Sequence, residues 1–176
     1  RGVLRHVSTV AVTSMSAALG AEVRCGDVRA LNDAAFRQVY QALLDNLVIR
    51  IRGQQLSDPE LIAFGARLGE LDFAPLAKTG KERARPHPEI IVVSNVMENG
   101  EAIGVLRDAE VVWHSDNSYR DRPLSYSALY ALEVPPAGGN TGFANMYLAL
   151  QTLDPALRRR IEGKALKSMR AQMSAA

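Results

Sequence analysis

The stretch that decides the fold is Val112-Trp113-His114-Ser115-Asp116-Asn117-Ser118-Tyr119. His114 and Asp116 lie two residues apart in a segment, residues 110–116, whose pattern predicts a β-strand. Alternate residues of a strand point to the same face, so we expect the imidazole and the carboxylate side by side. They would supply two of the three ligands of a two-His-one-carboxylate iron site. A His-x-Asp pair is common by chance, so the flanking sequence has to support this interpretation.

Short strands are predicted around this stretch. Residues 89–96 are rich in Ile and Val, and Asn99-Gly100 beyond them is a strong turn signal. Residues 125–134 predict another strand, and residues 141–145 a further one after the Pro-Pro-Ala-Gly-Gly turn at 135–139. The pattern favours a mainly β fold with flanking helices.

Helices are predicted on both sides of the strands. Asn32 is a suitable N-cap for an amphipathic helix over residues 33–46, followed by a short strand from Leu47 to Ile51. Ser57 and Glu60 have the spacing of a capping box and predict a second helix to about Leu68. Further helices are predicted over residues 146–153 and from Asp154-Pro155 to Ile161, with Gly163 as the stop.

Residues 72–89 predict a long irregular loop. Pro75, Gly80, Pro86 and Pro88 stand there among charged side chains. Such loops are often functional, so we expect either a lid over a binding site or a merely mobile connection. No repeat or linker interrupts the rest of the sequence, and we predict a single domain over residues 1–176.

Three runs of sequence together resemble the taurine and 2,4-dichlorophenoxyacetate dioxygenase family of Fe(II)- and 2-oxoglutarate-dependent enzymes. They are residues 112–119, 129–136 and 138–147, and their order and spacing match. The segments 20–24 and 52–54 are also similar to that family, so the resemblance covers essentially the whole chain. It implies a jelly-roll core, the double-stranded β-helix shared with cupins, apparently incomplete at the carboxy terminus.

The resemblance also implies a set of site residues. His114 and Asp116 would be ligands of Fe(2+), and Thr141 would hydrogen-bond a carboxylate of 2-oxoglutarate. His87 in the loop and Asn117 beside the ligands are candidate substrate contacts, although a loop histidine is more commonly just solvated. With O2 as the second cosubstrate, the implied reaction hydroxylates a small, anionic organic substrate and releases succinate and CO2.

Two groups of the family pattern find no match in the chain. These are the distal histidine that serves as third iron ligand and the arginine that pairs with the far carboxylate of 2-oxoglutarate. His6 and His87 do not match the distal motif, and Asn140 and Gly142 depart from the usual residues beside Thr141. We therefore expect the amino-terminal part of a longer dioxygenase. The alternative is a catalytically incomplete remnant that acts as an oligomerising or metal-binding domain.

Composition limits the possible partners. The 176 residues carry a formal net charge of only +2, with no one-sided basic stripe on a predicted helix, so we expect no nucleic acid partner. No apolar run is long enough to span a bilayer, so we expect no membrane partner. The single cysteine, Cys25, favours a reducing compartment, and we predict a cytoplasmic location. A first strand is a better reading of the first 21 residues than a targeting segment. A homo-oligomer remains possible.

Overall fold

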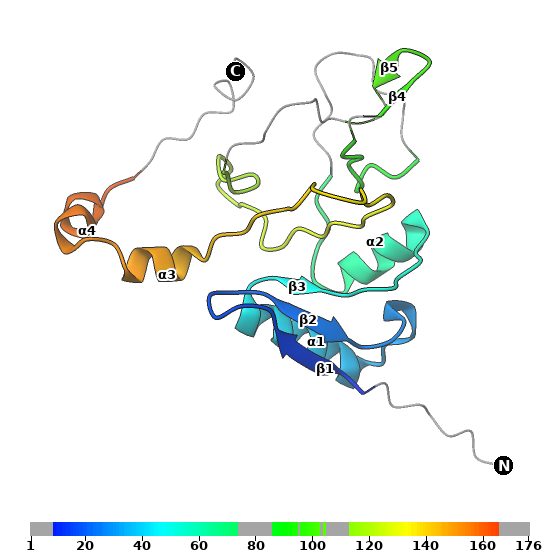
Figure 1. Ribbon diagram of the computed structural model, residues 1–176, viewed down its shortest axis with the longest axis horizontal. Coiled ribbons are helices and arrows are strands. Elements are labelled where there is room, and N and C mark those ends of the chain that lie inside the picture. The colour runs from blue at the N-terminus through cyan, green and yellow to red at the C-terminus, as the bar shows by residue number, and fades with distance from the viewer. Residues whose placement is uncertain (1–8, 74–85, 95, 103, 105–112, 166–176) are drawn as a thin grey trace. The chain divides into compact units, whose positions relative to one another are not determined.

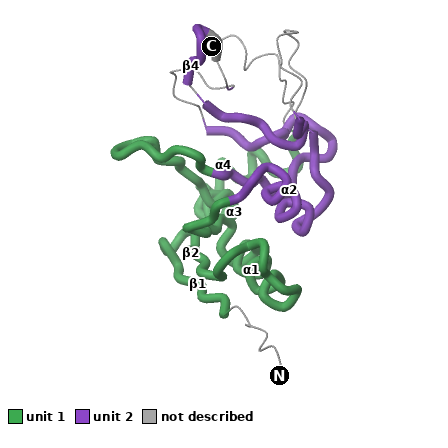
Figure 2. The backbone as a smooth tube through the Cα atoms, turned by 90° about the vertical axis from the view of Figure 1, so that its right-hand side faces the viewer, with its two compact units in different colours: residues 1–55, 131–166 green, residues 56–130, 167–176 purple. Residues whose placement is uncertain are grey.

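The computed structural model describes residues 9–73, 86–94, 96–102, 104 and 113–165. The chain divides into two compact units, shown in different colours in Figure 2. Unit 1 comprises residues 1–55 and 131–166, and unit 2 comprises residues 56–130 and 167–176. Each unit has its own secondary structure.

A three-stranded sheet forms the centre of unit 1. Its strands are β1 (Ala11–Ser14), β2 (Ala21–Arg24) and β3 (Ile49–Arg50), in the order β1-β2-β3. β2 pairs antiparallel with β1 and parallel with β3. The parallel pairing requires a crossover, and α1 (Asp33–Asn46) provides it and contacts β2 and β3 (Figure 1). The first strand expected near the amino terminus is thus confirmed at residues 11–14.

The core of unit 1 lies between β2 and α1. Ala21 and Val23 alternate along β2 and are at most 1% exposed, as is Cys25 just beyond the strand. Val39 faces them from α1, with Ala35 and Ala42 one turn to either side on the same helical face. Burial of these apolar groups is the main contribution that stabilises the unit.

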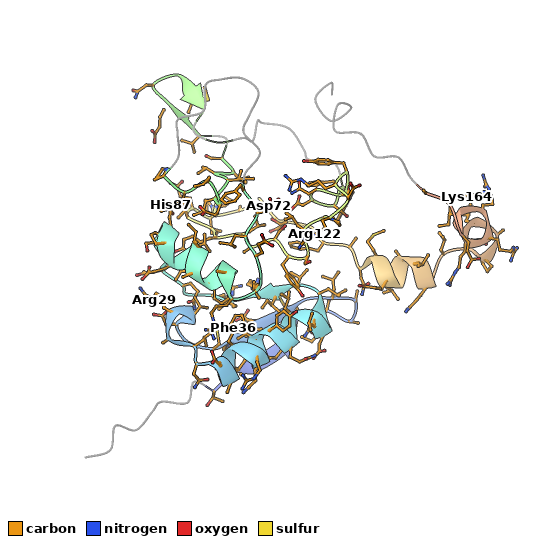
Figure 3. All side chains as sticks on the ribbon, turned by 180° about the vertical axis from the view of Figure 1, so that it is seen from behind. Arg29, Phe36, Asp72, His87, Arg122 and Lys164 are labelled. Atoms are coloured by element: carbon orange, nitrogen blue, oxygen red, sulfur yellow. The ribbon has the colours of Figure 1, made fainter. Side chains whose placement is uncertain are left out.

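The predicted helix over residues 33–46 is confirmed at both ends. The Oδ1 atom of Asn32 accepts a hydrogen bond from the amide of Ala35 at 2.9 Å, as an N-cap should. Phe36 lies on the first turn of this helix (Figure 3). The strand predicted from Leu47 begins two residues later, because Leu47 ends the helix with a φ of 65° and donates its N–H to the Leu43 carbonyl.

Unit 2 contains α2 (Asp58–Ala66) and a small hairpin of β4 (Met97–Glu98) and β5 (Glu101–Ala102). The predicted capping box is present, and the amide of Ser57 donates to Glu60 Oε2 at 2.8 Å. Asn99 and Gly100 form the hairpin turn with φ values of 53° and 79°. Two successive positive φ values define the turn type that Asn-Gly favours, so this prediction is confirmed.

The predictions of strands at residues 125–134 and 141–145 are wrong. The predicted strand at 89–96 is also absent from the residues of that range that the structure describes. These residues have no regular strand pairing, and residues 113–116 form a bend, coil and the start of a turn; residues 105–112 lie outside the described part. An alternating pattern favours extended backbone, but a strand also needs a hydrogen-bonded neighbour. Within the described residues these segments have none. The jelly-roll core therefore stays a prediction.

The last two predicted helices are present in unit 1 as α3 (Met146–Gln151) and α4 (Pro155–Ile161). Asp154 caps α4, with its Oδ1 atom accepting from the amide of Ala156 at 2.8 Å, and Gly163 follows with a φ of 69°. Neither helix has a buried residue. Among the described residues, no helix combines the length and apolar character needed to cross a membrane.

Candidate metal centre

The structure brings His114 and Asp116 together in unit 2. His114 Nε2 lies 3.3 Å from Asp116 Oδ1, and the two side chains are 41% and 54% exposed. The predicted proximity is therefore confirmed, although the backbone here is a bend and a turn and not a strand. Both side chains remain reachable from solvent.

A tight turn follows the pair and fixes the backbone after Asp116. Asn117 has a φ of 50°, a left-handed conformation that asparagine tolerates better than most residues. Its carbonyl accepts a hydrogen bond from the amide of Arg120 at 3.0 Å, and its Oδ1 atom accepts one from the Tyr119 hydroxyl at 3.0 Å. Arg120 also forms a short ion pair with Asp72. The turn is thus held by contacts inside it and by one contact to a distant residue.

Ser127 contacts the carboxylate of the pair. Its Oγ atom donates a hydrogen bond to Asp116 Oδ2 at 2.9 Å, from eleven residues further along the chain. Sequence reasoning missed this residue, and it missed the pairing of Asp72 with Arg120. A serine in a predicted strand carries no signal of its own, because the contact depends on how the chain folds back after the turn.

The donor set fits a divalent transition metal. Imidazole nitrogen and carboxylate oxygen are the ligands of the facial iron arrangement, and two such ligands at right angles, each about 2.1 Å from a metal, are roughly 3.0 Å apart. The 3.3 Å between His114 Nε2 and Asp116 Oδ1 is close to that separation. In the described part of the chain, no cluster of three His, Cys, Asp or Glu side chains is present. The pair offers an imidazole and a carboxylate, two of the three ligands that a facial site requires, and its role in metal binding stays a prediction.

The other predicted site residues lie in different surroundings. Asn117 is engaged by Tyr119, as described above. His87, labelled in Figure 3, lines a cavity of about 180 Å³ in unit 2 whose other lining residues are Asp58, Pro86, Ile90 and Val92. Thr141 is exposed in unit 1, in the coil before α3. The structure brings His114 and Asp116 together, and the binding roles of all five residues stay predictions.

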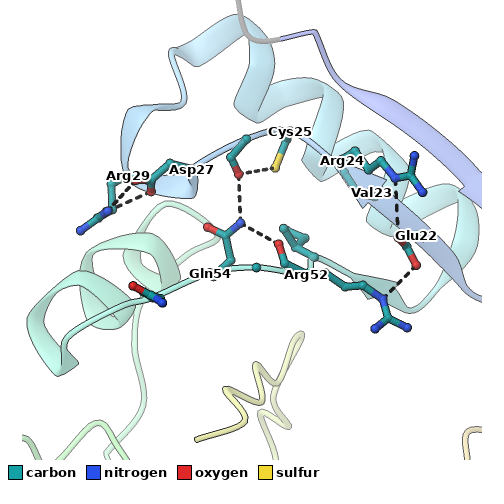
Figure 4. Close-up of a pocket in the computed structure, with 12 residues that line it drawn as sticks. Glu22, Val23, Arg24, Cys25, Asp27, Arg29, Arg52 and Gln54 are labelled. Atoms are coloured by element: carbon teal, nitrogen blue, oxygen red, sulfur yellow. Dashed lines mark hydrogen bonds and ion pairs between the residues drawn. The ribbon is translucent and has the colours of Figure 1, made fainter.

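A larger cavity, of about 510 Å³, lies in unit 1 between the end of β2 and residues 51–55 (Figure 4). Its volume is in the range of small-molecule pockets. However, its charged side chains pair with one another: Glu22 with Arg24 and Arg52, and Asp27 with Arg29. None of the predicted site residues lines it. We assign it a structural role for this reason.

Hydrogen bonds and ion pairs support the walls of this cavity. Gln54 accepts a hydrogen bond from the amide of Val28 at 3.0 Å and donates to the carbonyls of Gly26 and Arg52, so it ties the two sides together. Hydrogen bonding from Arg50 lowers the pKa of the Glu22 carboxyl, and Arg52 adds to the effect. Burial raises the pKa of the Cys25 thiol, which makes it a poor nucleophile.

Comparison with known proteins identifies the family. The profile of the family described as "Taurine catabolism dioxygenase TauD, TfdA family" matches residues 11–173, most of the chain. The chain belongs to this family. The resemblance found in the sequence is thereby confirmed over both units.

Relatives in the TauD, TfdA family are similar at the level of sequence and of structure. Pentalenolactone F synthase of Streptomyces avermitilis is 37% identical over 159 residues, which are 87% of this chain and 51% of that protein. The alpha-ketoglutarate-dependent 2,4-dichlorophenoxyacetate dioxygenase of Cupriavidus pinatubonensis is 33% identical over 142 residues, covering 76% and 49%. A crystal structure of AAD-2 in complex with Mn(II) and N-oxalylglycine superposes with a TM-score of 0.63 at 28% identity, covering 88% of this chain and 50% of that one.

The chain spans about half the length of the curated relatives that it matches. The match to the TauD, TfdA family includes His114, Asp116 and Thr141, whose site roles stay predictions. The third iron ligand and the arginine expected from the family resemblance have no counterpart in the matched sequence, so the family assignment does not by itself define a complete site.

Proposed function

We propose that the protein is a 2-oxoglutarate-dependent dioxygenase that hydroxylates a small, anionic organic substrate and releases succinate and CO2. The observation that carries this proposal is the 3.3 Å contact between His114 Nε2 and Asp116 Oδ1 in a chain of the TauD, TfdA family. An imidazole and a carboxylate at this distance suit Fe(II) binding and leave coordination positions for cosubstrates. The proposal concerns the whole protein, because the matched relatives are about twice as long.

Each predicted residue has a role in this proposal. His114 and Asp116 hold Fe(2+), and the hydroxyl of Thr141 donates to a carboxylate of 2-oxoglutarate. Iron held there would supply the oxidation chemistry, with 2-oxoglutarate and O2 as cosubstrates. His87 and Asn117 contact the substrate. Asn117 keeps two amide N–H donors for an anionic group while its Oδ1 atom accepts from Tyr119.

The proposed substrate class rests on the names of two relatives. One matched relative is named for 2,4-dichlorophenoxyacetate, and another is named a phenoxypropionate dioxygenase. Both names describe carboxylates. We propose that this protein also takes a small organic anion, that its core is a jelly roll, and that it acts in the cytoplasm.

Succinate formation tests the proposal. The protein made from its complete coding sequence is incubated with Fe(II), 2-oxoglutarate and O2, together with a panel of aryloxyalkanoates, sulfonates and alkyl sulfates. We expect at least one substrate to raise succinate formation well above the uncoupled rate. His114→Ala and Asp116→Ala are expected to lose turnover by two or more orders of magnitude, because loss of a first-row metal ligand removes the cofactor.

A matched control separates the site from the rest of its loop. Asp121→Ala removes another carboxylate five residues after Asp116 and is expected to retain turnover. Succinate formation that is equal in the His114→Ala variant and the wild type would contradict the proposal. A coding sequence without a histidine and a following arginine after residue 176 would also contradict it.

A second function is favoured by one observation, the exposure of large apolar side chains after the turn. Leu132 is 81% exposed and Val134 78% exposed. Large apolar side chains left in contact with solvent favour association with another protein surface. In this alternative the chain is a non-catalytic family member that oligomerises. It predicts a concentration-dependent increase in mass by sedimentation together with no succinate from any substrate, whereas metal-dependent succinate formation excludes it.

A further inference from the structure

The two oxygens of the Asp116 carboxylate have different partners. Oδ1 lies 3.3 Å from His114 Nε2, and Oδ2 accepts the hydrogen bond from Ser127 Oγ at 2.9 Å. The distance from Ser127 is normal for a hydroxyl donating to a carboxylate. The carboxylate is therefore oriented, with one oxygen directed to the imidazole and the other directed to the serine.

We infer that Ser127 is a positioning residue that holds Asp116 in the orientation that keeps Oδ1 beside the His114 imidazole, where the two groups would hold a metal. This inference rests on the proposed function, because it assumes that His114 and Asp116 hold a divalent ion. A carboxylate that is half exposed rotates readily and can offer either oxygen, or both. A donor on Oδ2 occupies that oxygen and keeps Oδ1 beside the imidazole.

The turn that follows Asp116 does not itself orient the carboxylate. The turn after Asp116 is held by Asn117, Tyr119 and Arg120 through contacts that involve no atom of the Asp116 side chain. These contacts fix the position of the backbone at Asp116. They do not fix the rotation of its carboxylate group. The hydroxyl of Ser127 reaches it from a separate segment and supplies that restraint. Outer hydrogen bonds of this kind typically change metal affinity by about 10- to 100-fold.

The test compares two substitutions of nearly equal shape. Ser127→Thr keeps a hydroxyl, and Ser127→Val replaces it with a methyl group. The dissociation constant for Mn(II) is measured on the full-length protein from the loss of the free aqueous Mn(II) EPR signal. We expect Ser127→Val to weaken Mn(II) binding about tenfold, the lower end of the range because the site is exposed, and Ser127→Thr to stay within about threefold of the wild type.

Two controls make the result specific. Ser125→Ala removes a hydroxyl from the same exposed segment and is expected to leave the Mn(II) affinity unchanged. In an Asp116→Ala background, Ser127→Val is expected to cause no further loss, because the carboxylate it orients is gone. Ser127 is exposed, so we expect all these variants to fold, with thermal unfolding midpoints close to that of the wild type.

The outcomes distinguish this inference from the proposed function. Equal Mn(II) affinity in Ser127→Val and the wild type would overturn the role of Ser127 while leaving the dioxygenase proposal standing. Equal weakening in Ser127→Thr and Ser127→Val would also overturn it, since the hydroxyl would then not matter. Mn(II) binding that does not respond to Asp116→Ala would overturn both.

Discussion

The segment from β1 to β3 and the segment from Trp113 to Ile161 differ in how far their apolar side chains are buried. In the first, Val23 and Val39 are each 1% exposed between a sheet and a helix. In the second, Trp113 is 75% exposed and Leu132 is 81% exposed, and α3 and α4 have no buried residue. The residues that support stability and the residues that carry the candidate chemistry therefore lie in different parts of the chain.

This difference shows two ways in which sequence sets structure. The strands and helix of residues 11–50 complete their hydrogen bonds and their core within 40 residues, so local patterns are enough. Residues after Trp113 have strand-like patterns but no described strand partner. The candidate metal ligands in this segment, His114 and Asp116, lie in contact although the described residues around them form no paired strand.

The same substitution in both segments gives the largest expected effect. Val39→Ala removes two buried methyl groups and leaves a small cavity, so we expect the free energy of unfolding to fall by about 2 kcal/mol. Val134→Ala, at a position 78% exposed, is expected to change it by no more than about 0.5 kcal/mol. Urea denaturation measures both. Equal losses of unfolding free energy in the two variants would show that Val134 is buried in solution. The contrast between the two segments would then not hold.

Removal of a helix cap is expected to have a smaller effect on stability, and again the effect should depend on whether the helix has buried residues. Asn32→Ala leaves the amide of Ala35 without its side-chain acceptor and is expected to lower the free energy of unfolding by about 1 kcal/mol. Asp154→Ala removes the corresponding cap of α4, which has no buried residue and should fray without affecting the core. We expect Asp154→Ala to shift the global unfolding transition far less than Asn32→Ala does. A shift as large as that of Asn32→Ala would mean that α4 unfolds together with the sheet.

The smallest effect concerns pH. The hydrogen bond from Arg50, and then that from Arg52, lower the pKa of Glu22 below its ordinary 4.5 in the folded protein. The ionised carboxylate therefore stabilises unit 1 above about pH 4.5, and this contribution is lost as the pH falls through the lowered pKa. The thermal midpoints of the wild type and Glu22→Gln should differ near pH 6, and the difference should shrink as the pH falls below 4.5 through the lowered pKa. A constant difference across this range would contradict the role of ionisation.

Sequence reasoning succeeded where the determining interactions are local. The Asn32 cap, the Ser57 and Glu60 box and the Asn99-Gly100 turn each depend on residues within four positions of one another, and all three are present. The proximity of His114 and Asp116 also followed from a spacing of two residues. The family was identified from short motifs whose order is preserved.

Sequence reasoning failed where the outcome depends on distant partners. The strand predicted over residues 125–134 needs a neighbour that no local pattern specifies, and the described residues provide none. Ser127 could not be linked to Asp116, because eleven residues and a left-handed turn at Asn117 separate the two contacting groups. Only the start of the strand predicted from Leu47 was wrong, and for a local reason: Leu47 ends the helix with a φ of 65°, so the strand begins at Ile49.

The most direct test of the central claim is the Mn(II) affinity of the pair itself. We expect the wild type to bind one Mn(II) per chain, and His114→Ala and Asp116→Ala each to weaken binding at least about 100-fold while their unfolding midpoints stay close to that of the wild type. Asp121→Ala, the matched carboxylate control, should bind as the wild type does. Binding by all four proteins with the same affinity would contradict the assignment of His114 and Asp116 as the metal centre.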